Sequence, residues 1–73
     1  KAEEFKKIRT NLELTQEQMA RVLGLSSFMA VSNIETGFRK PNKLAAAVMR
    51  ALDELPSKKA QELMGLLRKY LRS

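Results

Sequence analysis

The chain lacks the residues on which most enzyme chemistry depends. Its 73 residues include no cysteine and no histidine. Disulfides, thiolate metal sites, the usual general base and nearly every zinc ligand set are therefore excluded. There is also no glycine-rich phosphate loop, and the carboxylates of the adjacent Asp53 and Glu54 would point apart on a helix. We expect a protein that is not an enzyme and that uses no cofactor or metal.

Long apolar runs are missing too. No stretch approaches the roughly 18 apolar residues of a membrane-spanning helix. The first residues, which start at Lys1 rather than Met, do not form a secretory leader. We expect one soluble, cytoplasmic domain over residues 1–73, or the ordered part of a longer chain.

Positive charge is what the chain has in excess. Fourteen Lys and Arg residues face eight Asp and Glu residues, which gives a net charge of +6 and a pI near 10.1. A basic domain of this size suits a polyanion such as nucleic acid, or an anionic membrane surface. The plainer alternative is that the charge only keeps the protein soluble.

Apolar residues recur at helical spacing, and no stretch alternates as a strand would. The second helix has a capping box that starts at Thr15, and Gly24 ends it. Either Ser26 or Ser27 caps the third helix, and Asn42 caps the fourth. The predicted helices cover 2–11, 15–23, 26 or 27 to 36, 42–55 and 57–71. This pattern predicts a compact all-α bundle of five helices.

The same spacing predicts which side chains form the core. The expected inner faces are Phe5, Ile8 and Leu12; Met19, Ala20 and Leu23; Val31 and Ile34; Leu44, Val48, Ala51, Leu52 and Leu55; and Leu63, Met64, Leu67 and Tyr70. Leu66 and Leu71 fall beside the last stripe and widen it.

Two short helices joined by a glycine turn, over about 15–36, are a helix-turn-helix candidate. The motifs are Thr15-Gln16-Glu17-Gln18-Met19-Ala20, Leu23-Gly24-Leu25-Ser26, Val31-Ser32-Asn33-Ile34-Glu35-Thr36-Gly37 and Arg39-Lys40-Pro41. In this order they resemble the phage-repressor-like helix-turn-helix family, also called Cro/C1-type or Xre-type. The resemblance covers about residues 8–55. It implies a lambda-repressor-like domain whose third helix enters the DNA major groove.

One departure from the family concerns the start of the third helix. The family usually has three residues between the serine after the turn and the first apolar residue of this helix. Here four residues separate Ser26 from Val31. The extra residue either lengthens the turn or moves the cap to Ser27, and it leaves the register of the base-reading positions open by one residue.

Candidate base-reading residues lie on this third helix, because its start reaches base edges. Asn can pair with adenine through two hydrogen bonds, and apolar side chains contact the thymine methyl group. The alternative for the apolar candidates is core packing, and for the polar ones a solvated surface. The candidates are Ser27, Phe28, Met29, Ser32 and Asn33.

Candidate phosphate contacts lie at the starts of the second and fourth helices and in the loop before the fourth. Free backbone amides and the helix dipole form an anion site at each start, and cations bind phosphates directly. The alternatives are an ordinary capping box and a solvated basic loop. The candidates are Thr15, Gln16, Arg39, Lys40, Asn42 and Lys43.

Arg9 and Glu35 each follow a predicted core residue. In proteins of the family that the sequence resembles, these two positions form an ion pair that ties the first helix to the third. We therefore expect Arg9 and Glu35 to have a structural role.

The resemblance implies a regulator of transcription that binds double-stranded DNA as a homodimer on a palindromic operator, as a repressor. The alternative is an antitoxin-type or other protein-interaction module whose C-terminal helix holds a partner protein such as a toxin. A single-strand binder would need exposed aromatic residues, and the chain has only three Phe and one Tyr, of which Phe5 and Tyr70 are expected to be buried. The last helix is basic and amphipathic, but a core this small needs its apolar stripe, so we expect no membrane binding.

Overall fold

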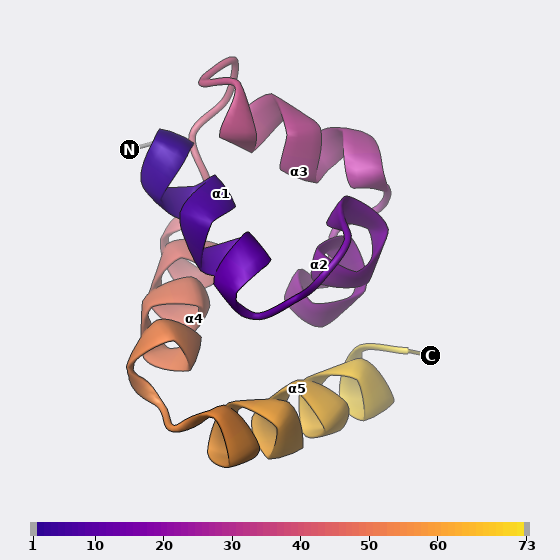
Figure 1. The fold of residues 1–73 in the computed structure, drawn as a ribbon. Coiled ribbons are helices and arrows are strands. Elements are labelled where there is room, and N and C mark those ends of the chain that lie inside the picture. Colours follow the sequence, from indigo (N-terminus) through magenta and orange to yellow (C-terminus); the bar gives the residue numbers. More distant parts are fainter. Residues whose placement is uncertain (1, 73) are drawn as a thin grey trace.

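The computed structural model describes residues 2–72, and its regular structure there is entirely helical (Figure 1). The helices are α1 (Ala2–Asn11), α2 (Gln16–Leu23), α3 (Phe28–Glu35), α4 (Lys43–Glu54) and α5 (Ser57–Leu71). The predicted all-α bundle of five helices is confirmed, with helix ends within about two residues of the expected ones. Within residues 2–72, no helix has both the length and the apolar character needed to cross a bilayer.

Local side-chain contacts set the helix ends. The Thr15 hydroxyl accepts a hydrogen bond from the Gln18 amide at 3.0 Å, and the Gln18 side chain accepts one from the Thr15 amide at 2.9 Å. Gly24 ends α2 with a left-handed backbone, φ 69°. Asn42 caps α4 by accepting a hydrogen bond from the Ala45 amide at 2.7 Å. The residue types that favour helix ends therefore act here as they do in other proteins.

The connection between α2 and α3 decides between the two possible caps. Ser27 is the N-cap of α3, with an extended backbone and no side-chain capping hydrogen bond. The extra residue thus lengthens the connection to residues 24–27, and α3 begins at Phe28.

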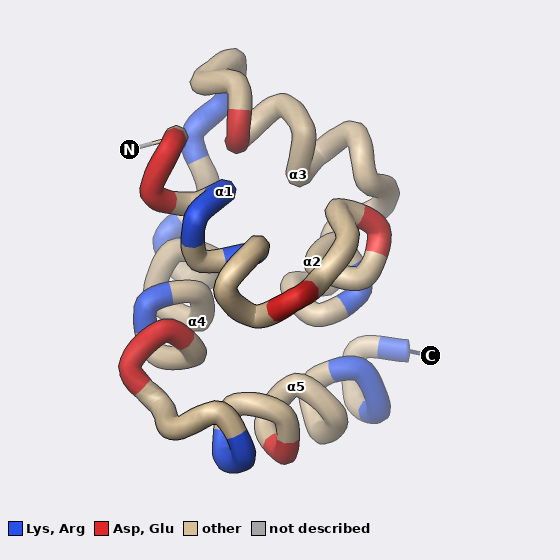
Figure 2. Tube along the Cα trace, in the orientation of Figure 1, with Lys and Arg blue, Asp and Glu red and all other residues tan. Residues whose placement is uncertain are grey.

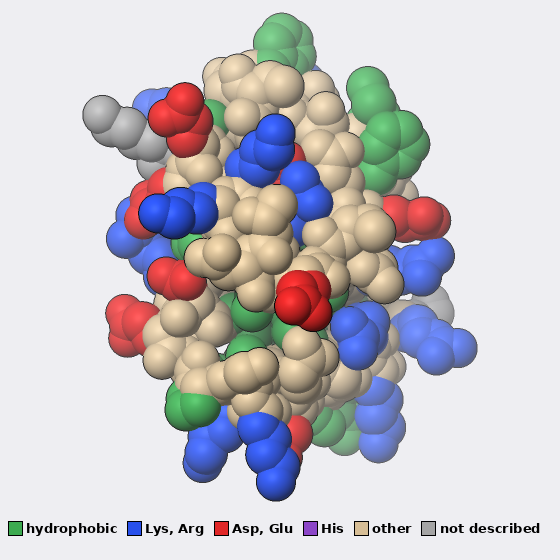
Figure 3. Space-filling model, in the orientation of Figure 1, with side chains coloured by type: hydrophobic (Ala, Val, Ile, Leu, Met, Phe, Trp, Pro, Cys, Tyr) green, Lys and Arg blue, Asp and Glu red, His purple; other side chains and the backbone are tan. Residues whose placement is uncertain are grey.

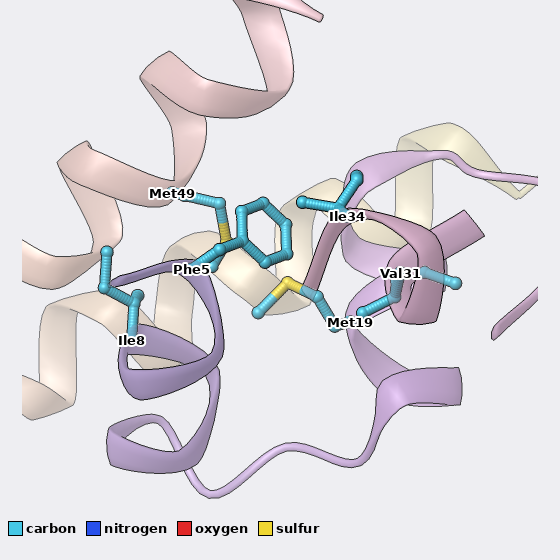
Figure 4. Close-up of a cluster of buried hydrophobic side chains, with 7 residues drawn as sticks. Phe5, Ile8, Met19, Val31, Ile34 and Met49 are labelled. Atoms are coloured by element: carbon cyan, nitrogen blue, oxygen red, sulfur yellow. The ribbon is translucent and has the colours of Figure 1, made fainter. Parts of the chain in front are cut away.

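The main core lies between α1, α2, α3 and α4. It consists of Phe5, Ile8, Met19, Ala20, Val31, Ile34 and Met49 (Figure 4). Only two of these side chains, Val31 and Ile34, come from α3, and both are buried. One face of α3 is therefore anchored in the core, which leaves the opposite face free of packing.

A second cluster holds α5 against the rest of the molecule. It consists of Val22, Leu52, Ala60 and Met64, all nearly inaccessible to solvent. Figure 1 shows α5 beneath α2 and α4, at the end of the molecule away from α3. The C-terminal helix therefore closes the bundle without covering α3.

Two large side chains that were predicted to be in the core are on the surface instead. In α4, Leu44 is 74% exposed, and Ala45 and Met49 occupy the core in its place. In α5, Tyr70 is 73% exposed. Side chains advance by about 100° per residue around a helix. A buried face that is predicted one residue away from its true position therefore includes side chains from the edge of the apolar stripe.

Two smaller differences from the predicted buried faces of α4 and α5 have the same cause. Ala51, predicted to face inward, is exposed. Leu71, placed beside the stripe of α5 by the sequence, lies on its inner side and covers Gly24: a Cβ atom on Gly24 would be 3.3 Å from its Cδ2 atom. The end of α5 thus packs on the glycine turn through Leu71 rather than through Tyr70.

Candidate nucleic-acid interface

The face of α3 opposite Val31 and Ile34 presents four side chains at spacings of three and four residues: Met29, Ser32, Asn33 and Thr36. We call this set the outward stripe. Met29 and Thr36 are exposed, and Ser32 and Asn33 are half-buried along the sides of the helix. Sequence reasoning did not select Thr36, although its spacing of three residues from Asn33 places it on the same face.

Phe28 and Met29 stand at the N-terminal end of α3, and neither belongs to the core. In the space-filling view, hydrophobic side chains protrude at the end of the molecule formed by α3 and the loop after it (Figure 3). The alternative that these two residues fill the core is therefore wrong. Ser27, directly before them, is exposed as well.

Arg9 and Glu35 form an ion pair that links α1 to the C-terminal end of α3. The Arg9 Nε atom donates to Glu35 Oε2 at 2.5 Å, and Nη2 donates to Oε1 at 3.1 Å. The third nitrogen, Nη1, donates to the carbonyl oxygen of Leu14 at 2.8 Å. The side chains are 12% and 3% exposed, so the pair is largely shielded from water.

Gln16 joins this pair from the start of α2. Its Nε2 atom donates to Glu35 Oε1 at 3.0 Å. Burial alone would raise the pKa of Glu35, but the hydrogen bonds from Arg9 and Gln16 and the positive charges nearby outweigh it and lower the pKa below its usual value. Glu35 is thus held as a carboxylate, and the three side chains fix α1, α2 and α3 relative to one another.

The position of Gln16 bears on its predicted contact with phosphate. One hydrogen of its amide nitrogen is committed to Glu35, and the nitrogen carries a second hydrogen that can reach another acceptor. Thr15 and Asn42 are similar: their side-chain oxygens accept capping hydrogen bonds, while the Thr hydroxyl hydrogen and the Asn amide hydrogens remain available as donors.

Three exposed cations follow α3: Arg39, Lys40 and Lys43. Within residues 2–72, none of them forms an ion pair, whereas Arg21 pairs with Glu17 and Arg50 pairs with Glu4. Figure 2 shows the positive segment of the loop beside the end of α3.

The loop that carries Arg39 and Lys40 starts directly from α3, and Lys43 is the first residue of α4. The Arg39 amide donates to the carbonyl oxygen of Asn33 at 3.1 Å. Gln16, through Glu35, brings the start of α2 to the same end of α3. The structure thus brings Gln16 and Arg39 to the C-terminal end of α3 and leaves the apolar pair at its N-terminal end.

Comparison with protein families identifies the same region. A family model described as helix-turn-helix matches residues 5–54, which is more than half of the chain. The match includes α2, α3 and the three cations that follow α3, and α5 lies outside it. Comparisons with curated proteins and with solved structures gave no significant match. The chain therefore belongs to the Cro/C1-type helix-turn-helix family of DNA-binding transcription regulators.

Proposed function

We propose that residues 1–73 form one domain that binds a specific duplex DNA sequence and represses transcription by occupying it. The observation that carries this proposal is the position of the outward stripe of α3, which is free of core packing and is followed by three cations without ion-pair partners in residues 2–72. A helix presented in this way fits the major groove, which is wide enough for an α-helix.

In this proposal the two sets of residues have different tasks. Arg39, Lys40 and Lys43, together with donors at the starts of α2 and α4, bind backbone phosphates and fix the position of the domain. The outward stripe, with Ser27 and Phe28 beside it, contacts base edges and provides specificity. Binding acts by occupancy alone and needs no chemical step.

We further propose that two copies bind together, through an exposed apolar surface on α5. Leu66 and Tyr70 lie four residues apart, on the same face of α5, and both are exposed. Recognition helices of a dimer must be about 34–36 Å apart to enter successive major grooves. The largest dimension of this chain is 30 Å, so the orientation in which two copies pair through α5 must place the recognition helices at this spacing.

A titration of DNA binding against salt tests the proposal. Fluorescence anisotropy with a duplex selected from a random pool should show affinity that falls steeply as salt rises. If each copy neutralises three phosphates, the logarithmic slope is about −5 for a dimer. Lys40→Ala should reduce the slope by about 2 per dimer. A flat salt response would contradict phosphate binding.

Lys58→Ala provides the matched control for Lys40→Ala. Lys58 is an exposed cation in the first turn of α5, away from α3, and its substitution makes the same change of charge. It should leave the slope nearly unchanged. An equal loss for the two variants would mean that the net charge, rather than the loop after α3, is responsible for binding.

The exposed apolar residues of α5 favour a second candidate, a protein-interaction module of the antitoxin type. Leu66→Lys and Tyr70→Ser separate the two candidates. If α5 forms the dimer, the variants become monomeric in analytical ultracentrifugation and bind a palindromic duplex more weakly. If α5 holds a different protein, they remain as associated as the wild type and repress a reporter normally, whereas Asn33→Ala does not.

A further inference from the structure

We propose that α3 reads A·T base pairs, with Phe28 and Met29 on thymine methyl groups and Asn33 on adenine. This inference rests on the proposed function and names the class of DNA sequence that the outward stripe recognises. Three properties of α3 support it: the helix has no Lys or Arg, its N-terminal end is apolar, and the side-chain amide of Asn33 has no hydrogen-bond partner within residues 2–72.

The first property is the absence of a guanine reader. Between Phe28 and Glu35, the only charged residue is Glu35 itself, and Figure 2 shows no positive segment on this helix. Glu35 is held by Arg9 and Gln16 and does not face outward. The commonest specific contact to guanine uses Arg or Lys, and α3 has neither.

The second property is the apolar end. Phe28 is 51% exposed and Met29 is 53% exposed, side by side in the first turn of α3. The first turn is the part of a recognition helix that reaches base edges. The thymine methyl is the apolar group that a base pair presents in the major groove. Among the four bases, thymine is therefore the one that can bury the exposed apolar surface of Phe28 and Met29 by contact.

The third property is the side-chain amide of Asn33. Within residues 2–72 it makes no hydrogen bond, although the backbone carbonyl of Asn33 accepts one from the Arg39 amide. A free carboxamide can accept from N6 and donate to N7 of adenine at the same time. Met29 and Asn33 lie four residues apart on the outward stripe, about 6 Å along the helix axis.

Two duplexes that differ only in methyl groups test this inference. The first carries the half-site selected from a random pool, and the second carries deoxyuridine in place of each thymine within it. We expect A·T pairs to dominate the selected half-site. We also expect the wild type to bind the thymine duplex about fourfold more tightly for each methyl group that it covers.

The double variant Phe28→Ala, Met29→Ala assigns the effect to the apolar end. Both side chains are exposed, so circular dichroism and thermal unfolding should show an intact fold. Its affinities for the two duplexes should be equal. Phe38→Ala is the matched control, because Phe38 is an exposed phenylalanine outside α3, and it should retain the wild-type preference for thymine.

Three outcomes would overturn the inference. They are a selected half-site dominated by G·C pairs, equal binding of the thymine and deoxyuridine duplexes by the wild type, and a thymine preference that persists in the double variant. Each of them still leaves salt-dependent binding to duplex DNA. Failure of the proposed function itself would look different, because no duplex would then show salt-dependent binding.

Discussion

Arg9 and Glu35, which are 26 positions apart in the chain, meet through two hydrogen bonds in a largely buried ion pair. Gln16 donates to the same carboxylate. The orientation of α3, and with it the direction of the outward stripe, depends on this contact as well as on the two core residues of the helix.

Removing the arginine should therefore destabilise the protein strongly. Arg9→Met leaves the Glu35 carboxylate buried with one donor fewer on each oxygen, and loss of one partner of a buried pair costs about 3–5 kcal/mol. Urea unfolding followed by circular dichroism measures this loss. Arg50→Met is the control, since Arg50 pairs with Glu4 on the surface and its loss should cost less than about 1 kcal/mol. Equal losses for the two variants would contradict a special role for Arg9.

The same carboxylate makes stability depend on pH. The pKa of Glu35 is lowered by folding, so ionised Glu35 stabilises the folded protein at pH values above its ordinary pKa of 4.5. This stabilisation is lost as the pH falls below that value and through the folded pKa. Thermal unfolding of the wild type and of Glu35→Gln, measured from pH 7 to pH 3, tests this. The gap between their melting temperatures should narrow toward pH 3, and a constant gap would refute the assignment.

Gly24→Ala should destabilise the turn between α2 and α3. Gly24 has φ 69°, and a Cβ atom there would lie 3.3 Å from the Leu71 side chain. The left-handed backbone costs a non-glycine residue about 1–2 kcal/mol, and Leu71 must move as well. The measurement is the midpoint of urea unfolding. An unchanged midpoint would mean that the turn adopts another conformation in solution.

Gly65→Ala should have the opposite effect. Gly65 lies within α5, and apart from its chain neighbours and the backbone of the helix no atom of the described residues lies within 4 Å of the Cβ position. Alanine is favoured over glycine inside a helix by about 0.5–1 kcal/mol. The melting temperature should rise, and a decrease would show that a second molecule packs closely against this part of α5.

Helix positions could be predicted from the sequence because their signals are local. The capping box at Thr15, the cap at Asn42 and the stop at Gly24 each involve residues within about four positions of one another. The apolar spacing of α1, α2 and α3 also points to the residues that form the main core. Such signals do not depend on the rest of the molecule.

Interactions between distant segments could not be predicted in the same way. The hydrogen bond from Gln16 to Glu35 could not be predicted, because nothing near Gln16 in the sequence indicates a carboxylate 19 positions later. The contact of Gln16 with phosphate stays a prediction. The predicted buried faces of α4 and α5 were wrong at Leu44 and Tyr70, because both helices carry more apolar residues than their buried faces hold. Which of these residues is buried depends on the neighbouring helix.

The division of α3 into two faces also matters for protein engineering. Val31 and Ile34 hold the helix in the core, whereas Met29, Ser32, Asn33 and Thr36 contribute nothing to that core. Libraries randomised at the exposed positions Met29 and Thr36 should consist largely of folded proteins, because surface substitutions rarely change stability by more than about 0.5 kcal/mol. If α3 reads DNA as proposed, changes at such positions alter the DNA sequence that is bound without redesign of the interior.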